Sequence, residues 1–155
     1  MNKIGLFGLL RFMFLLVFVF VIFVPSIGSA QSLGFGQDNT KPINIEANEG
    51  IEWQRNEKVY IARGDAQASQ GDVTVRADEL IAYYRTNKTG TDEIYKIHAK
   101  GSVQISSKTE LATSEKAIYD LIAGVLIMTG GQVRLVTPED KIIAYESLEY
   151  YEGKQ

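Results

Sequence analysis

The sequence predicts an all-β domain built from antiparallel strands, and three observations lead to this prediction. Apolar and polar residues alternate with a period of two in many short runs from Ile43 onward. Clusters of turn-forming residues separate the runs, often at the roughly 8–12-residue spacing of sandwiches and barrels. A strand–glycine–strand pattern also occurs three times. Alternation over short runs is typical of strands that bury one face, so we expect antiparallel sheet throughout.

The runs can be followed along the chain by their paired apolar residues. These pairs are Ile43 and Ile45, Ile51 and Trp53, Val59 and Ile61, Ala66 and Ala68, Val73 and Val75, Val103 and Ile105, and Val133 and Leu135. Turn signals lie between runs at 55–57, 70–72, 86–90, 106–108, 123–124 and 138–140. Val, Ile, Thr and Tyr are abundant, and strands favour these residues.

Residues 76–84, RADELIAYY, are the best helical candidate. Leu80, Ile81 and Tyr84 would share one face of a helix. However, Leu80, Ala82 and Tyr84 also alternate, and the segment directly follows a predicted strand. We therefore predict a strand here.

The repeated pattern aligns on Gly64, Gly101 and Gly131, which are 37 and 30 residues apart. A glycine inside a continuing strand usually marks a bulge or a sharp bend. Each unit is predicted to be a long strand bent at its glycine, followed by a return strand that ends in Tyr84, Tyr119 or Tyr145. The spacing favours stacked supersecondary units, and a plain β-meander with glycines at its corners is the alternative.

The N-terminus has the order of a secretory signal peptide. Lys3 and Arg11 precede the apolar run 12–24, and small residues stand at Gly28 and Ala30. The apolar run would span about 20 Å as a helix, which is short of the roughly 30 Å core of a bilayer. We predict a cleaved signal peptide at 1–30, and a retained membrane anchor is the alternative. A mature protein that begins at Gln31 would exclude the anchor.

Residues 31–42 are rich in glycine and polar residues, which predicts a flexible lead-in. The domain itself is expected at 43–153. After residue 30 the chain holds 14 Lys and Arg against 19 Asp and Glu, since only Lys3 and Arg11 precede it. An acidic chain without basic clusters argues against nucleic acid as a partner.

The residue types argue against catalysis. The chain has no Cys, and His98 is its single His. Metal sites and nucleophilic triads need several such groups together. Paired acids such as Asp78 and Glu79 are adjacent, so on a strand they point to opposite faces and make poor acid–base partners. We expect no enzyme, no metal site and no cofactor.

Two long stretches of the chain resemble a known family. Residues 42–84 contain PINIE, GDAQA and VRADEL in order, and 114–135 contain KAIYDL followed by a glycine-bent strand. This order is similar to the OstA-like N-terminal domain family over nearly all of 42–151. The resemblance implies a twisted, slightly open antiparallel β-jelly roll of two sheets. It also implies transport of lipopolysaccharide, with the lipid A part bound between the sheets and copies joined end to end by strand pairing.

If the resemblance holds, the apolar residues that alternate along the strands and point inward are predicted to bind lipid. These residues are Ile43, Ile45, Val59, Ile61, Val103, Ile105, Tyr119 and Leu121, with ordinary core packing as the alternative for each. Of these, Ile43, Ile105, Tyr119 and Leu121 match positions where the family places groove residues. The strands 43–53 and 142–153 are the expected free edges of the sheet.

The function implied by the resemblance is that of a periplasmic lipopolysaccharide carrier that helps to bridge the inner and outer membranes. Its expected partners are lipopolysaccharide, inner-membrane and outer-membrane transport proteins with similar β-jelly-roll domains, and further copies of itself. Two alternatives stay open. One is a structural adaptor that pairs strand edges without binding lipid, and the other is a membrane-anchored docking subunit of the same export system.

Overall fold

The computed structural model describes Leu33 and residues 41–151, which form ten β-strands and no helix. The strands are β1 (Asn44–Glu46), β2 (Gly50–Gln54), β3 (Val59–Gln70), β4 (Val73–Thr86), β5 (Asp92–Ser106), β6 (Leu111–Asp120), β7 (Val125–Thr129), β8 (Val133–Val136), β9 (Lys141–Ala144) and β10 (Ser147–Tyr151). The predicted signal peptide 1–30, the lead-in apart from Leu33, Lys41 and Pro42, and residues 152–153 lie outside the described residues. Within the described part, no helix is long and apolar enough to cross a membrane.

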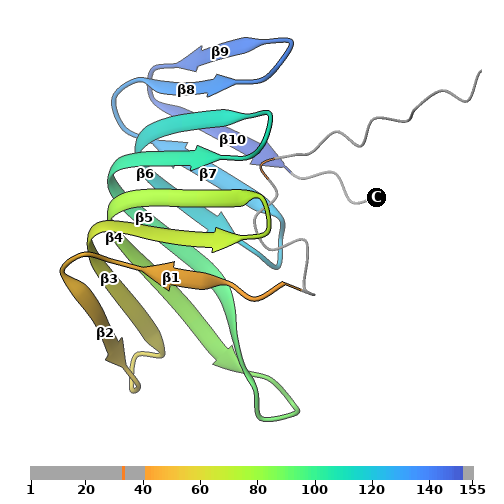
Figure 1. Cartoon of the computed structure of the whole chain (residues 1–155). Coiled ribbons are helices and arrows are strands. Elements are labelled where there is room, and N and C mark those ends of the chain that lie inside the picture. Colours follow the sequence, from red (N-terminus) through yellow and green to blue (C-terminus); the bar gives the residue numbers. More distant parts are fainter. Residues whose placement is uncertain (1–32, 34–40, 152–155) are drawn as a thin grey trace, which may run out of the picture. The chain divides into compact units, whose positions relative to one another are not determined.

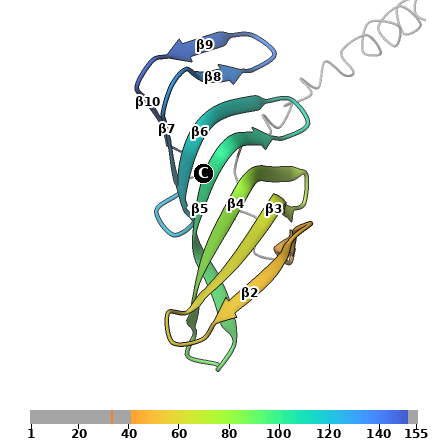
Figure 2. The ribbon, with the colours of Figure 1, turned by 90° about the vertical axis from the view of Figure 1, so that its left-hand side faces the viewer.

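All strand pairs are antiparallel and belong to one sheet, whose main order is β1-β3-β4-β5-β6-β7-β10. The long strands β3 to β6 bend midway, so each contributes to two layers. The first layer runs from β2 through one half of each long strand to β7 and β10. The second runs from β1 through the other halves to β8 and β9. The bends line up on the left of Figure 1, and Figure 2 views the sheet from that side.

Glycines form the bends of two long strands. The pairing of β3 with β4 shifts register after Arg63, and that of β5 with β6 shifts after Lys100. Gly64 and Gly101 follow these residues with φ of 77° and 76°, a left-handed conformation that costs a glycine little. These β-bulges turn the strands sharply, as the repeated glycines predicted.

An acidic side chain from the adjacent segment lies directly against each bend glycine. A Cβ at Gly64 would lie 2.5 Å from Cγ of Glu49, and one at Gly101 would overlap the carboxylate of Asp78. At the passage from β7 to β8, a Cβ at Gly130 would lie 2.7 Å from Oε2 of Glu115. Glycine is therefore required at these positions for space as well as for conformation.

The third repeat differs from the prediction. Gly130 and Gly131 lie between β7 and β8, so two strands stand where one bent strand was expected. Tyr84 and Tyr119 are buried strand residues, whereas Tyr145 is 75% exposed between β9 and β10. The prediction that 76–84 is a strand is confirmed, because this segment lies within β4.

The free ends of the sheet are also divided between the layers. The segment 43–53, expected as one edge strand, forms β1 in the second layer and β2 in the first. The segment 142–153 likewise contributes to β9 and β10. In the described residues each of these four strands pairs on one side only. The sheet is therefore open at both ends.

Replacing Gly101 by Ala should destabilise the protein strongly. The new methyl group would meet Asp78 and would hold a non-glycine residue at positive φ. We expect the free energy of unfolding, measured by urea titration, to fall by roughly 2–4 kcal/mol.

Gly90→Ala is the matched control for this variant. Gly90 has a similar φ of 83°, but nothing lies within 4 Å of an added Cβ. The free energy of unfolding of Gly90→Ala should fall by only about 1 kcal/mol, which is the cost of the backbone conformation alone. Equal losses in the two variants would mean that the carboxylate contact does not constrain the bend.

Candidate functional site

Two apolar rows face each other between the layers. In the first layer, the cross-strand partners form the row Trp53, Tyr60, Ala82, Ile97, Tyr119, Leu126 and Tyr150. In the second layer, the row is Ile45, Ala68, Val75, Ile105, Ala112, Leu135 and Ile142. Most members of both rows belong to one hydrophobic cluster, so the interior between the layers is continuous and apolar.

Six of the eight predicted lipid-binding residues lie on these inner faces. Ile45 and Ile105 share the second-layer row, and Tyr119 belongs to the facing row. The remaining three are Val103, which is 1% exposed in the same cluster, and Ile43 and Leu121, which pack against it. The structure thus brings residues from β5, β6 and the segment before β1 together.

Val59 and Ile61 lie on the opposite face of the first layer, which corrects the prediction of a single inward row. Ile61 is in register with Ile81, and through it with His98 and Ile118, on the outer side. Both residues are buried but lie outside the interior cluster. Their neighbours Tyr60 and Ala62 point inward instead, because successive residues of a strand alternate between faces.

A cavity of about 380 Å³ opens between the layers on the side away from the bends. Its apolar lining comes mainly from Ile43, Ile94, Leu121 and Ile122. Its polar lining comes from Lys41, Gln70, Arg85, Glu93 and Tyr95. A lining that combines aliphatic and charged side chains is suited to an amphipathic ligand.

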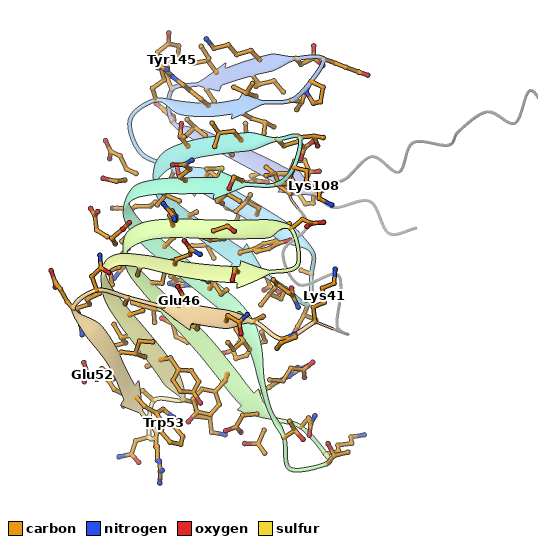
Figure 3. All side chains as sticks on the ribbon, in the orientation of Figure 1. Lys41, Glu46, Glu52, Trp53, Lys108 and Tyr145 are labelled. Atoms are coloured by element: carbon orange, nitrogen blue, oxygen red, sulfur yellow. The ribbon has the colours of Figure 1, made fainter. Side chains whose placement is uncertain are left out.

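Polar contacts join two turns of the second layer to each other and to Lys41, which lines this cavity. Lys108 of the β5–β6 turn forms a 2.8 Å ion pair with Asp72 of the β3–β4 turn, and the hydrogen bond from Lys108 lowers the pKa of Asp72. The Gln70 amide donates a 2.9 Å hydrogen bond to the backbone oxygen of Lys41. Lys41 and Lys108 lie on the same side of the sheet in Figure 3.

An aromatic stack closes the first-layer row at its β2 end. Trp53 stacks on Tyr60 with centroids 5.7 Å apart, and the Arg55 guanidinium lies 4.1 Å from the centre of the Trp53 ring. The Trp53 indole donates a 2.9 Å hydrogen bond to the Tyr84 hydroxyl. These contacts fix the Trp53 side chain at the end of the row, although it is still 47% exposed. Trp53 lies at the lower end of the sheet in Figure 3.

The family model described as LptA/(LptD N-terminal domain) LPS transport protein matches residues 44–155. The chain belongs to this family. The resemblance to OstA-like domains is thereby confirmed. A curated relative from Rhizobium meliloti (strain 1021), named uncharacterized protein R00383, is 27% identical over 111 residues. That match covers 69% of this chain, and the chain spans only about 59% of the relative's length.

A solved structure matches this LptA-family fold. It is LptH from Pseudomonas aeruginosa, described as the LptA homologous periplasmic component of the lipopolysaccharide transport device. The TM-score is 0.61 at 17% identity, over 73% of this chain and 78% of that chain. At this identity the likeness establishes the fold, so the predicted open antiparallel β-jelly roll is confirmed.

The outer face of the LptA-family sheet carries His98, which packs on Tyr83 with ring centroids 4.9 Å apart. Burial, together with the positive charges of Lys96 and Lys100, lowers the pKa of His98 and so favours its neutral imidazole. Within the described residues, no three His, Asp or Glu side chains gather as metal ligands.

Leu33 is one of the interior residues that the sequence did not predict. It was assigned to a flexible lead-in, yet it is 1% exposed and belongs to the apolar cluster. Its backbone donates a hydrogen bond to the Glu110 carboxyl group beside the β5–β6 turn. Burial raises the pKa of Glu110, and this hydrogen bond opposes the rise. The other carboxyl oxygen, Oε2, is buried without a hydrogen-bond partner in the described part.

Glu110→Gln should stabilise the protein at neutral pH. Because the pKa of Glu110 is raised in the folded state, the wild type loses stability as pH rises from below 4.5 through that folded value. Gln cannot ionise and avoids this loss. We expect the variant to have the higher melting temperature at pH 7, and the difference to vanish below about pH 4.5.

Glu139→Gln provides the control, since Glu139 is an exposed residue of the β8–β9 turn. Its melting temperature should follow the wild type across the same pH range. A Glu110→Gln variant that is less stable than wild type at pH 7 would contradict the assignment of a costly buried charge.

Proposed function

We propose that this chain is a periplasmic carrier that binds lipopolysaccharide and holds the acyl chains of lipid A between its two layers. The observation that carries the proposal is the pair of facing apolar rows in a member of a lipopolysaccharide-transport family. Export of the chain through a cleaved signal peptide at 1–30 belongs to the same proposal. The periplasmic description of LptH supports this location.

The energetics of acyl chains explain why such a carrier needs an apolar interior. Each methylene exposed to water costs about 0.8 kcal/mol, so a chain of about twelve carbons costs on the order of 10 kcal/mol. The rows of aliphatic and aromatic side chains offer non-directional contacts instead. Such contacts bind an acyl chain without fixing it at one point, which suits a ligand that must move on.

The rim of the cavity supports an amphipathic ligand in particular. Lys41 and Arg85 line it beside Ile43, Leu121 and Ile122. Arg85 forms a 3.5 Å ion pair with the exposed Glu93, and such surface pairs contribute little stability. The acyl chains would lie inside, with anionic groups of the head at the rim.

In this proposal the chain performs no chemical reaction and needs no cofactor. Binding and release of lipid are its only steps, and the energy for directed passage comes from partner proteins. Its membership in a family of transport proteins supports this reading.

Bridging of the membranes would use the open ends of the sheet. The strands β1, β2, β9 and β10 each present one unpaired edge in the described residues. Backbone N–H and C=O groups on such edges pair readily with another strand. Inner-membrane and outer-membrane proteins with similar β-jelly rolls, and further copies of this chain, are the proposed partners. The same edges would serve a structural adaptor that binds no lipid.

Photocrosslinking separates the carrier from the adaptor. A photoreactive phenylalanine analogue at Tyr119, which is 3% exposed on the inner face, should crosslink to lipopolysaccharide in cells that produce it. The same analogue at Ile118, which is 39% exposed on the outer face, should give at least tenfold less product. Immunoblots for the lipid-modified protein measure both yields.

Ile105 and its outer neighbour Gln104 repeat this comparison in the second layer, because their side chains point to opposite faces. Absence of lipid product at Tyr119 and Ile105, with partner binding intact, would favour the adaptor. Equal yields from inner and outer positions would show that lipid contact is not confined to the interior, which would contradict the proposed site.

Cysteine crosslinking tests end-to-end pairing between copies. The chain has no Cys of its own, so introduced thiols report without background. Glu46 of β1 and Ile143 of β9 are both exposed on edge strands of the second layer. Opposed residues of paired strands have Cβ atoms about 5 Å apart, which permits a disulfide. A chain carrying Glu46→Cys and Ile143→Cys should form a ladder of oligomers on mild oxidation.

A second chain, with Glu46→Cys and Lys141→Cys, tests a different register of this pairing. A chain with Gln104→Cys and Glu46→Cys is the control, because Gln104 lies in the middle of the sheet. If every edge combination gives only the short products of the control on non-reducing gels, self-assembly through these edges is ruled out.

A further inference from the structure

Leu33 is an apolar residue in a mostly polar stretch of the sequence. It is the one strongly apolar aliphatic residue of 31–42, a stretch otherwise rich in glycine and polar residues. Nevertheless its side chain is 1% exposed and lies in the same cluster as Ile105, Tyr119 and Leu126, which come from both layers. A residue from outside the strands thus occupies the apolar interior.

Leu33 is held beside the β5–β6 turn, at the end of the second layer away from the bends. Its backbone hydrogen-bonds Glu110, the residue that directly precedes β6. The Lys108–Asp72 ion pair joins this turn to the β3–β4 turn. Lys41 is attached to the β3–β4 turn in two ways. Its backbone oxygen accepts the hydrogen bond from Gln70, and its side chain packs on Gly71, where an added Cβ would lie 3.2 Å from Cδ of Lys41.

These attachments are weaker than those of a strand residue. Leu33 belongs to no strand and gains no ladder of backbone hydrogen bonds. Oε2 of the carboxyl group that Leu33 contacts is buried, and within the described residues it has no hydrogen-bond partner. An opening of this region that lets water reach the oxygen would regain its hydration, which offsets part of the cost of opening.

We propose that Leu33 is a built-in occupant of the lipid site, filling apolar space that the first acyl chain of the ligand takes over. The inference rests on the proposed lipid-carrying function and adds a step to it. In the empty protein, Leu33 keeps water from the interior. When lipid binds, the Leu33 side chain leaves, and the acyl chain replaces its contacts.

The experiment compares Leu33→Ser with Leu111→Ser in the full chain. Leu111 is the matched control because it lies next to Glu110 but is 37% exposed on the outer face of β6. Titration with purified lipopolysaccharide should give a dissociation constant roughly tenfold lower for Leu33→Ser, since the lipid no longer displaces a buried leucine. Leu111→Ser should match the wild type. Affinity equal to or weaker than wild type in a folded Leu33→Ser variant would overturn the proposal.

Amide hydrogen exchange on the wild-type protein tests the same step without any variant. Saturating lipopolysaccharide should speed exchange at the Leu33 amide, which loses Glu110, and slow it at Ile105. Protection of both amides on lipid binding would mean that Leu33 stays in place, and the inference would fail.

The apolar dye N-phenyl-1-naphthylamine distinguishes failure of this inference from failure of the proposed function. If neither wild type nor variant binds lipopolysaccharide, the carrier function is wrong. The dye still reports access to the interior in that case. Fluorescence several-fold higher with Leu33→Ser than with Leu111→Ser supports Leu33 as an occupant, and equal fluorescence refutes it.

Discussion

The architecture depends on the contact between a carboxylate side chain and a glycine at the bends. Glu49 lies on Gly64, Asp78 on Gly101, and Glu115 on Gly130 and Gly131, always between adjacent segments of the sheet. These contacts lie side by side across the sheet, so the bends of successive strands are aligned. The two layers therefore separate from one side only, and most residues of their apolar rows share one cluster between them.

The fold class was predictable because a period of two follows directly from the pleat of a strand. The glycine bends were predictable because few other residues adopt their conformation. Inner and outer faces were harder to assign in 59–62, where Val59 and Ile61 are more apolar than Tyr60 and Ala62. The even-numbered residues 60, 62, 66 and 68 face the interior on both sides of the Gly64 bend. This regular alternation identifies the interior face better than the hydrophobicity of the individual residues does.

Other features had no local signal in the sequence. The bends of β4 and β6 contain no glycine, and they form where Asp78 and Glu115 meet glycines of later segments. The buried state of Leu33 likewise depends on distant residues of both layers, so its polar neighbours predicted a loose segment. Long-range contacts of this kind follow from the assembled sheet and not from any short stretch of residues.

The two ends of the sheet are made of different strands, β1 and β2 at one end and β9 and β10 at the other. Contact between unlike ends is heterologous, so each added subunit exposes a fresh copy of the surface just covered. Growth by this rule has no inherent stopping point. The length of any such filament would have to be set by a terminating protein that offers only one of the two surfaces.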